Sequence, residues 1–150
     1  LIRSSKEYKR YIELLRSNVQ ELNMDSILSN ITTDDVDLEF HHYPFSLYDL
    51  VETLVMKRFI DKKTITSFSI AKEVMELHYQ NVVGLVPLTV TMHELAHNGD
   101  IFISAKQIFG NYIKFMDEYK EGISLAIIDK IEELHKKTDQ NMPSDFKGLF

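Results

Sequence analysis

The sequence predicts a single α+β domain that is mostly helical and contains a small β element. Its 150 residues are the length of one ordinary domain. Several segments repeat apolar residues at three- and four-residue spacing, which is typical of amphipathic helices. Two short segments instead carry alternating or β-branched residues, which favour strands.

The first expected helix runs from about Ser5 to Leu22. Its apolar residues recur every three or four positions, as one buried helix face requires. They are Tyr8, Tyr11, Ile12, Leu15, Val19 and Leu22. This face is expected to pack against the rest of the domain.

The segment VDLEFHH, residues 36–42, alternates apolar with polar or charged side chains. Successive side chains of a strand point to opposite faces, so the segment predicts a strand with one apolar face and one ligand-rich face that carries Glu39 and His41. On a regular strand the adjacent His41 and His42 also point to opposite sides. Pro44 is expected to end the strand.

Two helices are expected between this strand and the next. Ser46 is followed three residues later by Asp49, which resembles a capping box and begins a helix to about Phe59. The second helix is expected over residues 69–79. We interpret His78, near its end, as a surface or capping histidine.

The segment NVVGLVPLTVT, residues 81–91, is rich in β-branched residues and predicts a short strand or hairpin. It leads into MHELAH, whose His93 and His97 are four residues apart and therefore share one helix face. Asn98 and Gly99 are expected to end this helix.

The C-terminal part is expected to return to helix. DIFIS, residues 100–104, resembles a further strand, and helical periodicity then runs over residues 105–137 with a break near Gly110 or Gly122. The polar tail is expected to be loose. We divide the chain into an N-terminal helical segment (1–35), a central unit (36–103) with a helical insertion at about 46–80, and C-terminal helices with the tail (104–150).

Composition and charge limit the possible classes of partner. No apolar run is long enough to span a membrane, no cysteine is present and no signal-peptide pattern opens the sequence, so we expect no membrane partner and a cytoplasmic location. The net charge of -6, from 17 Lys+Arg and 23 Asp+Glu, is unusual for a DNA-binding protein. A bound cation and a local basic cluster would compensate for it; the candidate cluster is Lys57, Arg58, Lys62 and Lys63.

Histidines of the first strand and of the MHELAH helix form a candidate metal site. Three imidazoles that bind one cation leave coordination positions for water and substrate, as catalytic sites do. A histidine that does not bind the metal remains available as a general base. The pair His41 and His42 therefore allows one ligand and one base.

The order of HH, the strand VVGLVPL and the helix MHELAHNG resembles the ββα-metal finger of HNH (His-Me finger) endonucleases, which bacteriophages often encode. The resemblance covers residues 36–44 and 81–103. It implies a small ββα-metal core embedded in the mostly helical domain, and it implies hydrolysis of DNA phosphodiester bonds, in the host cytoplasm if a phage encodes the chain. Carried over by residue, it makes His42 the general base and makes His41, His93 and His97 the ligands of one divalent ion of magnesium, manganese, nickel or zinc.

The resemblance also assigns a bracing role to an asparagine about nine positions before the first helix histidine. Gly84 occupies that position here. Either Asn81, three residues earlier, has this role from a shifted register, or the role is lost. The basic residues at positions 57, 58, 62 and 63 are the expected contacts to DNA.

Two alternatives remain open. In the first, His93-Glu94-x-x-His97 is the helix of a zinc metalloprotease with Glu94 as base, and Glu118 or Glu121 supplies a third ligand. In the second, the chain is a structural or assembly module without metal chemistry.

Overall fold

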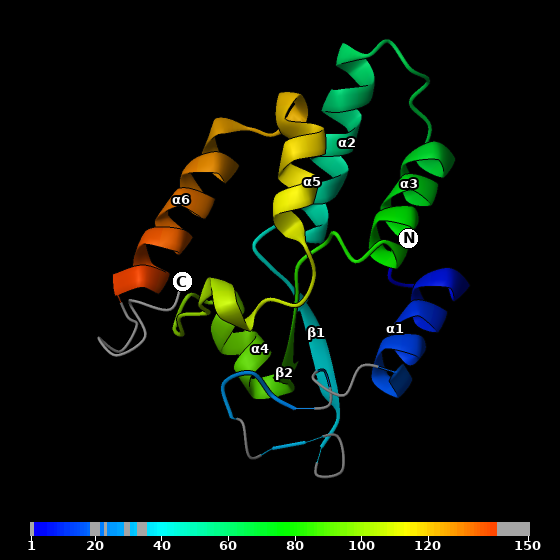
Figure 1. The fold of residues 1–150 in the computed structure, drawn as a ribbon. Helices are drawn as coiled ribbons and strands as arrows, with labels where there is room; N and C mark the ends of the chain where they lie inside the picture. Colours follow the sequence, from blue (N-terminus) through cyan, green and yellow to red (C-terminus); the bar gives the residue numbers. More distant parts are fainter. Residues whose placement is uncertain (1, 19–21, 23, 29–30, 33–35, 141–150) are drawn as a thin grey trace.

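The computed structural model describes residues 2–18, 22, 24–28, 31–32 and 36–140 (Figure 1). The elements are α1 (Lys6–Asn18), β1 (Leu38–His42), α2 (Leu47–Ile60), α3 (Ser67–Tyr79), β2 (Leu85–Thr89), α4 (Val90–His97), the 3-10 turns η2 (Ala105–Gln107) and η3 (Lys120–Gly122), α5 (Tyr112–Tyr119) and α6 (Leu125–Gln140). The predicted α+β class is confirmed. Among the described helices, none combines the length and the apolar character that a membrane crossing requires.

The two strands pair antiparallel, and the helix that follows continues directly from the second strand. His41 lies opposite Val86, and His42 lies opposite Leu85. Since directly paired residues share a face, one face carries His41 and Val86 and the other carries His42 and Leu85. Thr89 ends β2 and is also the N-cap of α4, where its hydroxyl accepts from Met92 N at 3.2 Å. The order is therefore strand, strand, helix.

The helices α2 and α3 are inserted between the paired strands. The predicted capping box is present, because Asp49 N donates to the Ser46 hydroxyl and Ser46 N donates to the Asp49 carboxylate. The chain leaves the sheet at Tyr43 and returns at Gly84, where Tyr43 N donates to Gly84 O at 3.0 Å. The insertion thus leaves the strand ends side by side, as a loop of any length permits.

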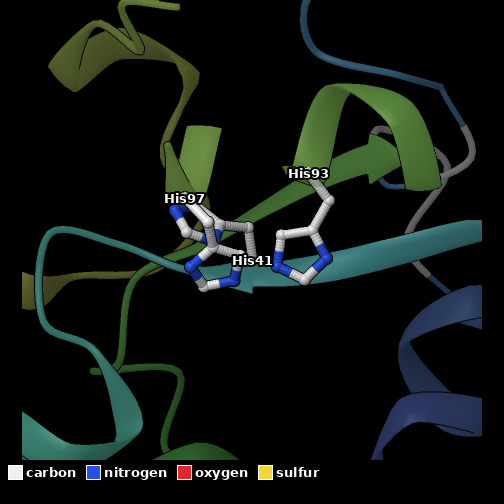
Figure 2. Close-up of side chains that lie close together, drawn as sticks. All are labelled: His41, His93 and His97. Carbon is white, nitrogen blue, oxygen red and sulfur yellow. The ribbon is translucent and has the colours of Figure 1, made fainter. Parts of the chain in front are cut away.

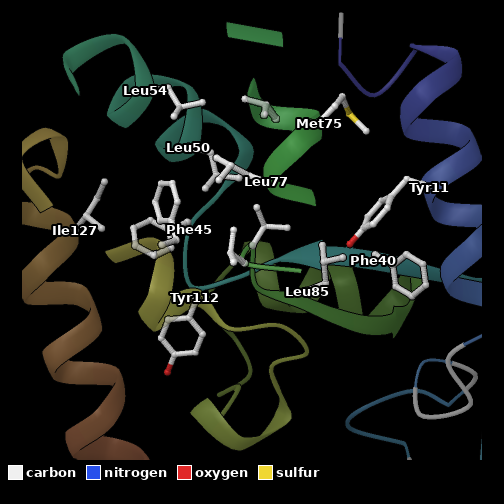
Figure 3. Close-up of a cluster of buried hydrophobic side chains, with 14 of the residues drawn as sticks. Tyr11, Phe40, Phe45, Leu50, Leu54, Met75, Leu77, Leu85, Tyr112 and Ile127 are labelled. Carbon is white, nitrogen blue, oxygen red and sulfur yellow. The ribbon is translucent and has the colours of Figure 1, made fainter. Parts of the chain in front are cut away.

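The main hydrophobic core lies between the inserted helices, the C-terminal helices, α1 and the His42 face of the sheet (Figure 3). Its least exposed large side chains include Phe45, Leu50, Leu54, Leu85 and Phe115. A smaller cluster of Val86, Leu88 and Ile103 lies on the opposite face, with Met92 of α4 packed against it. The sheet therefore has buried apolar residues on both faces.

The C-terminal predictions are partly wrong. DIFIS forms no strand; the outer edge of β2 pairs instead with Phe109, through Leu85 N to Phe109 O at 2.9 Å and the reverse bond at 2.8 Å. The helical region is interrupted at both Gly110 and Gly122, whereas one break, at either glycine, was predicted. Thr138, assigned to the loose tail, is buried in α6. The predicted tail residues 141–150, and the predicted helical residues 19–21, lie outside the described residues.

A buried carboxylate ties the segment after α1 to the start of α4. Asp25 is fully buried. One of its oxygens accepts from Ile27 N and Leu28 N, and the other accepts from Thr89 N at 2.5 Å. Hydrogen bonds to a charged group of this kind are each worth about 1.5–3 kcal/mol. No local sequence pattern indicates this contact, which holds the first residue before α4 in place.

Two glycines allow a matched test of this architecture. A Cβ on Gly84 would lie 1.8 Å from Tyr43 O, whereas a Cβ on Gly99 would meet nothing within 4 Å, although Gly99 has a φ of +76°. Gly84→Ala should lower the free energy of unfolding by about 3 kcal/mol through steric overlap, and Gly99→Ala by about 1 kcal/mol through backbone strain. Urea denaturation measures the free energy of unfolding of both variants. An equal loss in the two variants, or a larger loss in Gly99→Ala, would contradict the close approach of the Tyr43 backbone to Gly84.

Candidate metal centre

Three imidazoles converge in the space between β1 and α4 (Figure 2). His41 comes from β1, and His93 and His97 come from α4. One nitrogen of each ring lies within 4.8 Å of the others. The ring centroids are 4.9 Å apart for His41 and His93, 4.9 Å for His41 and His97, and 4.6 Å for His93 and His97. The three predicted ligand residues are therefore together.

Local geometry explains this convergence. Strand alternation places His41 on the sheet face that α4 covers, and the four-residue spacing of the other two histidines places them on one side of the helix. His41 and His93 are each 8% exposed, whereas His97 is exposed. The cluster thus has two buried members and opens to solvent at the third.

Glu39 orients His93. Its carboxylate accepts from His93 Nδ1 at 2.5 Å. With the proton on Nδ1, the other ring nitrogen, Nε2, carries a lone pair, and this atom is buried with no hydrogen-bond partner among the described residues. A carboxylate that holds the far nitrogen of a histidine is the usual companion of a metal ligand. The donor set suits a cation.

The surroundings of His41 and His97 disfavour the charged form of both imidazoles. Burial, and then the proximity of His93 and His97, lowers the pKa of His41 to about 4. The pKa of His97 is lowered as well, first by desolvation and then by His93. Arg3 acts in the same direction on both residues, and Lys130 on His41. Neutral imidazoles have the free lone pairs that metal coordination requires.

His42 does not join this cluster. It lies on the opposite face of β1, is 4% exposed, and its Nε2 is 2.9 Å from Nε2 of His78. Burial, followed by the neighbouring His78, lowers the pKa of His42 to about 3. The strand regularity that makes His41 a candidate ligand therefore also directs His42 away from the other three histidines.

The tautomers of this pair follow from its hydrogen bonds. His78 Nδ1 is 2.7 Å from Val74 O, and a carbonyl only accepts, so Nδ1 of His78 carries the proton. Nε2 of a neutral His78 then accepts, which requires His42 Nε2 to donate. His42 Nδ1 is left with a lone pair, and this atom is buried without a partner among the described residues.

The interpretation of His78 as a surface histidine was wrong. The side chain is fully buried, with Tyr8 and Tyr11 packed against it edge-on. The position of His78 near the end of α3 suggested a surface or capping role, but α1 covers this face. Its contact with His42 spans 36 positions of sequence, and no local pattern indicates it.

Asn81 has a structural position in the turn after α3. It adopts a positive φ of 55°. Its side-chain oxygen accepts from the Tyr11 hydroxyl at 3.3 Å, and its backbone oxygen accepts from Asn111 N at 2.7 Å. It is not a member of the described histidine cluster. A side chain at Gly84, where the HNH resemblance predicted an asparagine, would overlap with the backbone of Tyr43.

The predicted DNA-binding cations lie at the far end of α2, away from α4 (Figure 1). Lys57 forms ion pairs with Asp61 and Glu121, at 2.9 and 3.0 Å. Arg58 pairs with Glu73 at 2.7 Å. Lys62 and Lys63 are exposed in the turn that follows. The first two charges are therefore already neutralised, and none of the four lies in the histidine cluster.

In the protease alternative, the third candidate ligand is His41 and not one of the two predicted glutamates. Glu121 pairs with Lys57, and Glu118 lies 3.9 Å from Lys114, so neither belongs to the described cluster. His41 occupies that third place. Glu94 is exposed on α4 between the two helix histidines.

Fold and site together define a class: a small α+β protein whose strand–strand–helix unit carries a three-histidine candidate metal centre. The family model of the Bacteriophage G278-like virion protein matches residues 1–148. The chain belongs to this family, which confirms the expected phage origin. No curated protein and no solved structure matches the chain. The resemblance to HNH endonucleases and the host-cytoplasm location stay predictions.

The tautomer assignment can be checked directly. Long-range ¹H–¹⁵N correlation spectra should show His42 protonated at Nε2 and His78 protonated at Nδ1, because Val74 O can only accept a hydrogen bond from His78 Nδ1. His78→Phe should remove the acceptor and change the His42 signals, while His135, which contacts Tyr112 elsewhere, should be unchanged and serves as control. A His42 protonated at Nδ1 in the wild type would contradict the assignment.

Proposed function

We propose that this chain is a divalent-metal-dependent endonuclease that hydrolyses DNA phosphodiester bonds, with His41, His93 and His97 as the ligands of one cation. The convergence of these three imidazoles between a strand and a helix, in the order strand, strand, helix, is the observation that carries the proposal. Glu39, which orients His93, supports it.

The donor set favours a catalytic over a structural site. A cation held by three imidazoles keeps positions for solvent and a phosphate oxygen, where it supplies positive charge and lowers the pKa of water. Imidazole ligands suit zinc and nickel better than magnesium. The exposed His97 marks the side from which substrate would approach.

His42 is the proposed general base. Its Nδ1 carries the free lone pair. Nδ1 is the ring nitrogen closer to the backbone, and His42 is adjacent in sequence to the proposed ligand His41. Because Nδ1 is buried in the described conformation, the proposal requires that substrate binding make this atom accessible to water. His78 and Val74 O hold the ring in the tautomer that accepts a proton at Nδ1.

A metallopeptidase is the second candidate. It is favoured by the position of Glu94, which lies on α4 between two of the ligands, whereas His42 faces away from them. In this alternative Glu94 is the base and His42 has only a packing role.

Metal binding is the first test. Isothermal titration should show one zinc ion per chain, and His93→Ala should abolish tight binding because a central ligand is lost. Glu39→Ala should weaken affinity by about 10- to 100-fold, as loss of an orienting carboxylate does. Asp37→Ala removes an exposed acid two residues earlier and is the matched control. If titrations with zinc, nickel, manganese and magnesium all show no stoichiometric binding, only the structural-module alternative remains.

Nicking of supercoiled plasmid with zinc, nickel, manganese or magnesium is the test of activity. Wild type and Glu94→Gln should nick, and His42→Ala should lose activity by about 100-fold or more, the usual contribution of a general base, while still binding zinc. Casein hydrolysis by the same three proteins is the counter-assay. Loss of proteolysis in Glu94→Gln with no nicking by any variant would favour the peptidase.

A further inference from the structure

A groove lies between α1 and β1, and one residue of the histidine cluster, His93, is part of its lining. Its lining residues come from the segment before α1, from α1 itself, from β1 and from α4: Arg3, Tyr8, Ile12, Arg16, Glu39, Phe40 and His93. Tyr8, Ile12 and Arg16 follow one another at four-residue spacing, so they form one ridge of the helix. A candidate metal ligand is therefore part of the groove wall.

An arginine lies towards each end of this groove. Arg16 donates to Leu38 O at 2.6 Å, at the start of β1, and its guanidinium lies 5.7 Å from the Phe40 ring centroid. Arg3 is close enough to His41 and His97, beyond the middle of β1, to influence both electrostatically. Glu39 and His93 lie between these positions.

These arginines differ from the basic residues of the α2–α3 turn. Among the described residues, neither Arg3 nor Arg16 forms an ion pair with a carboxylate, whereas Lys57 and Arg58 do. Both arginine side chains are exposed. The Glu39 carboxylate in the same groove is directed at His93. The groove therefore presents unneutralised guanidinium groups beside the cluster, in a chain with a net charge of -6.

The geometry points to this groove as the binding site for the sugar-phosphate backbone of a DNA strand, with Arg3 and Arg16 contacting phosphates on either side of His93. The inference rests on the proposed function. From Tyr8 to Arg16 the helix rises about 12 Å. The phosphates of one strand of duplex DNA are about 3.4 Å apart when projected on the helix axis, so a groove of this length is long enough to contact more than one phosphate. Guanidinium groups bind phosphate through paired N–H donors.

DNA binding without cleavage is the test. Anisotropy of a short labelled duplex in EDTA, over about 50–200 mM salt, measures the slope of log K against log salt. Arg3→Gln/Arg16→Gln should reduce that slope by about two, one for each lost phosphate contact. Lys62→Gln/Lys63→Gln removes two exposed charges from the α2–α3 turn and should leave the slope unchanged.

Each outcome decides the inference. Arg16 also donates to Leu38 O, so the double variant could be destabilised, which urea denaturation would reveal. In that case Arg3→Gln alone is the test, with an expected reduction of the slope by about one. A wild type that binds no DNA, or a slope lost only in the lysine variant, would overturn the inference. DNA binding that depends on the arginines, without plasmid nicking, would support the groove as a DNA-binding site and reject the proposed endonuclease. Plasmid nicking that the arginine substitutions do not change would support the endonuclease and reject the groove.

Discussion

The antiparallel pairing of β1 with β2 is the constraint on which the rest of the structure depends. It fixes which side chains of β1 point towards α4, and α4 has no freedom of its own because it continues from the last residue of β2. Asp25 strengthens this junction through Thr89 N. A shift of the register by one residue would exchange the two faces of the strand and would replace His41 with His42 beneath α4.

The same pairing separates two groups of histidines with different surroundings. On the α4 face, His41 and His93 are buried and His97 is exposed, and Nε2 of His93 has no hydrogen-bond partner among the described residues. On the core face, His42 and His78 are buried and bonded to each other. Buried polar groups normally form hydrogen bonds with one another. The contact between His42 and His78 is therefore explained by the stability of the core as well as by the proposed catalytic role of His42. The activity proposed for this chain depends on whether His42 Nδ1 becomes accessible.

Local patterns predicted much of the fold and the convergence of three histidines. The alternation at residues 36–42, the capping box at Ser46 and the four-residue spacing of the helix histidines act over a few positions, and all three hold in the structure. Contacts distant in sequence were not predictable in this way. Lys57 is neutralised by Glu121, 64 positions away, and α1 both buries His78 and brings Arg16 to β1. The cationic side chains near the histidine cluster therefore include Arg3 and Arg16, and not the basic residues 57, 58, 62 and 63 that the sequence suggested.

Membership in a phage virion protein family leaves the chemistry of the cluster as the central question. X-ray absorption at the zinc edge of the zinc-loaded protein addresses it most directly. The account predicts three imidazole nitrogens at about 2.0–2.1 Å together with one or two oxygen ligands from solvent. A fully hydrated ion, or four protein ligands with no solvent position, would contradict an open three-histidine centre between β1 and α4.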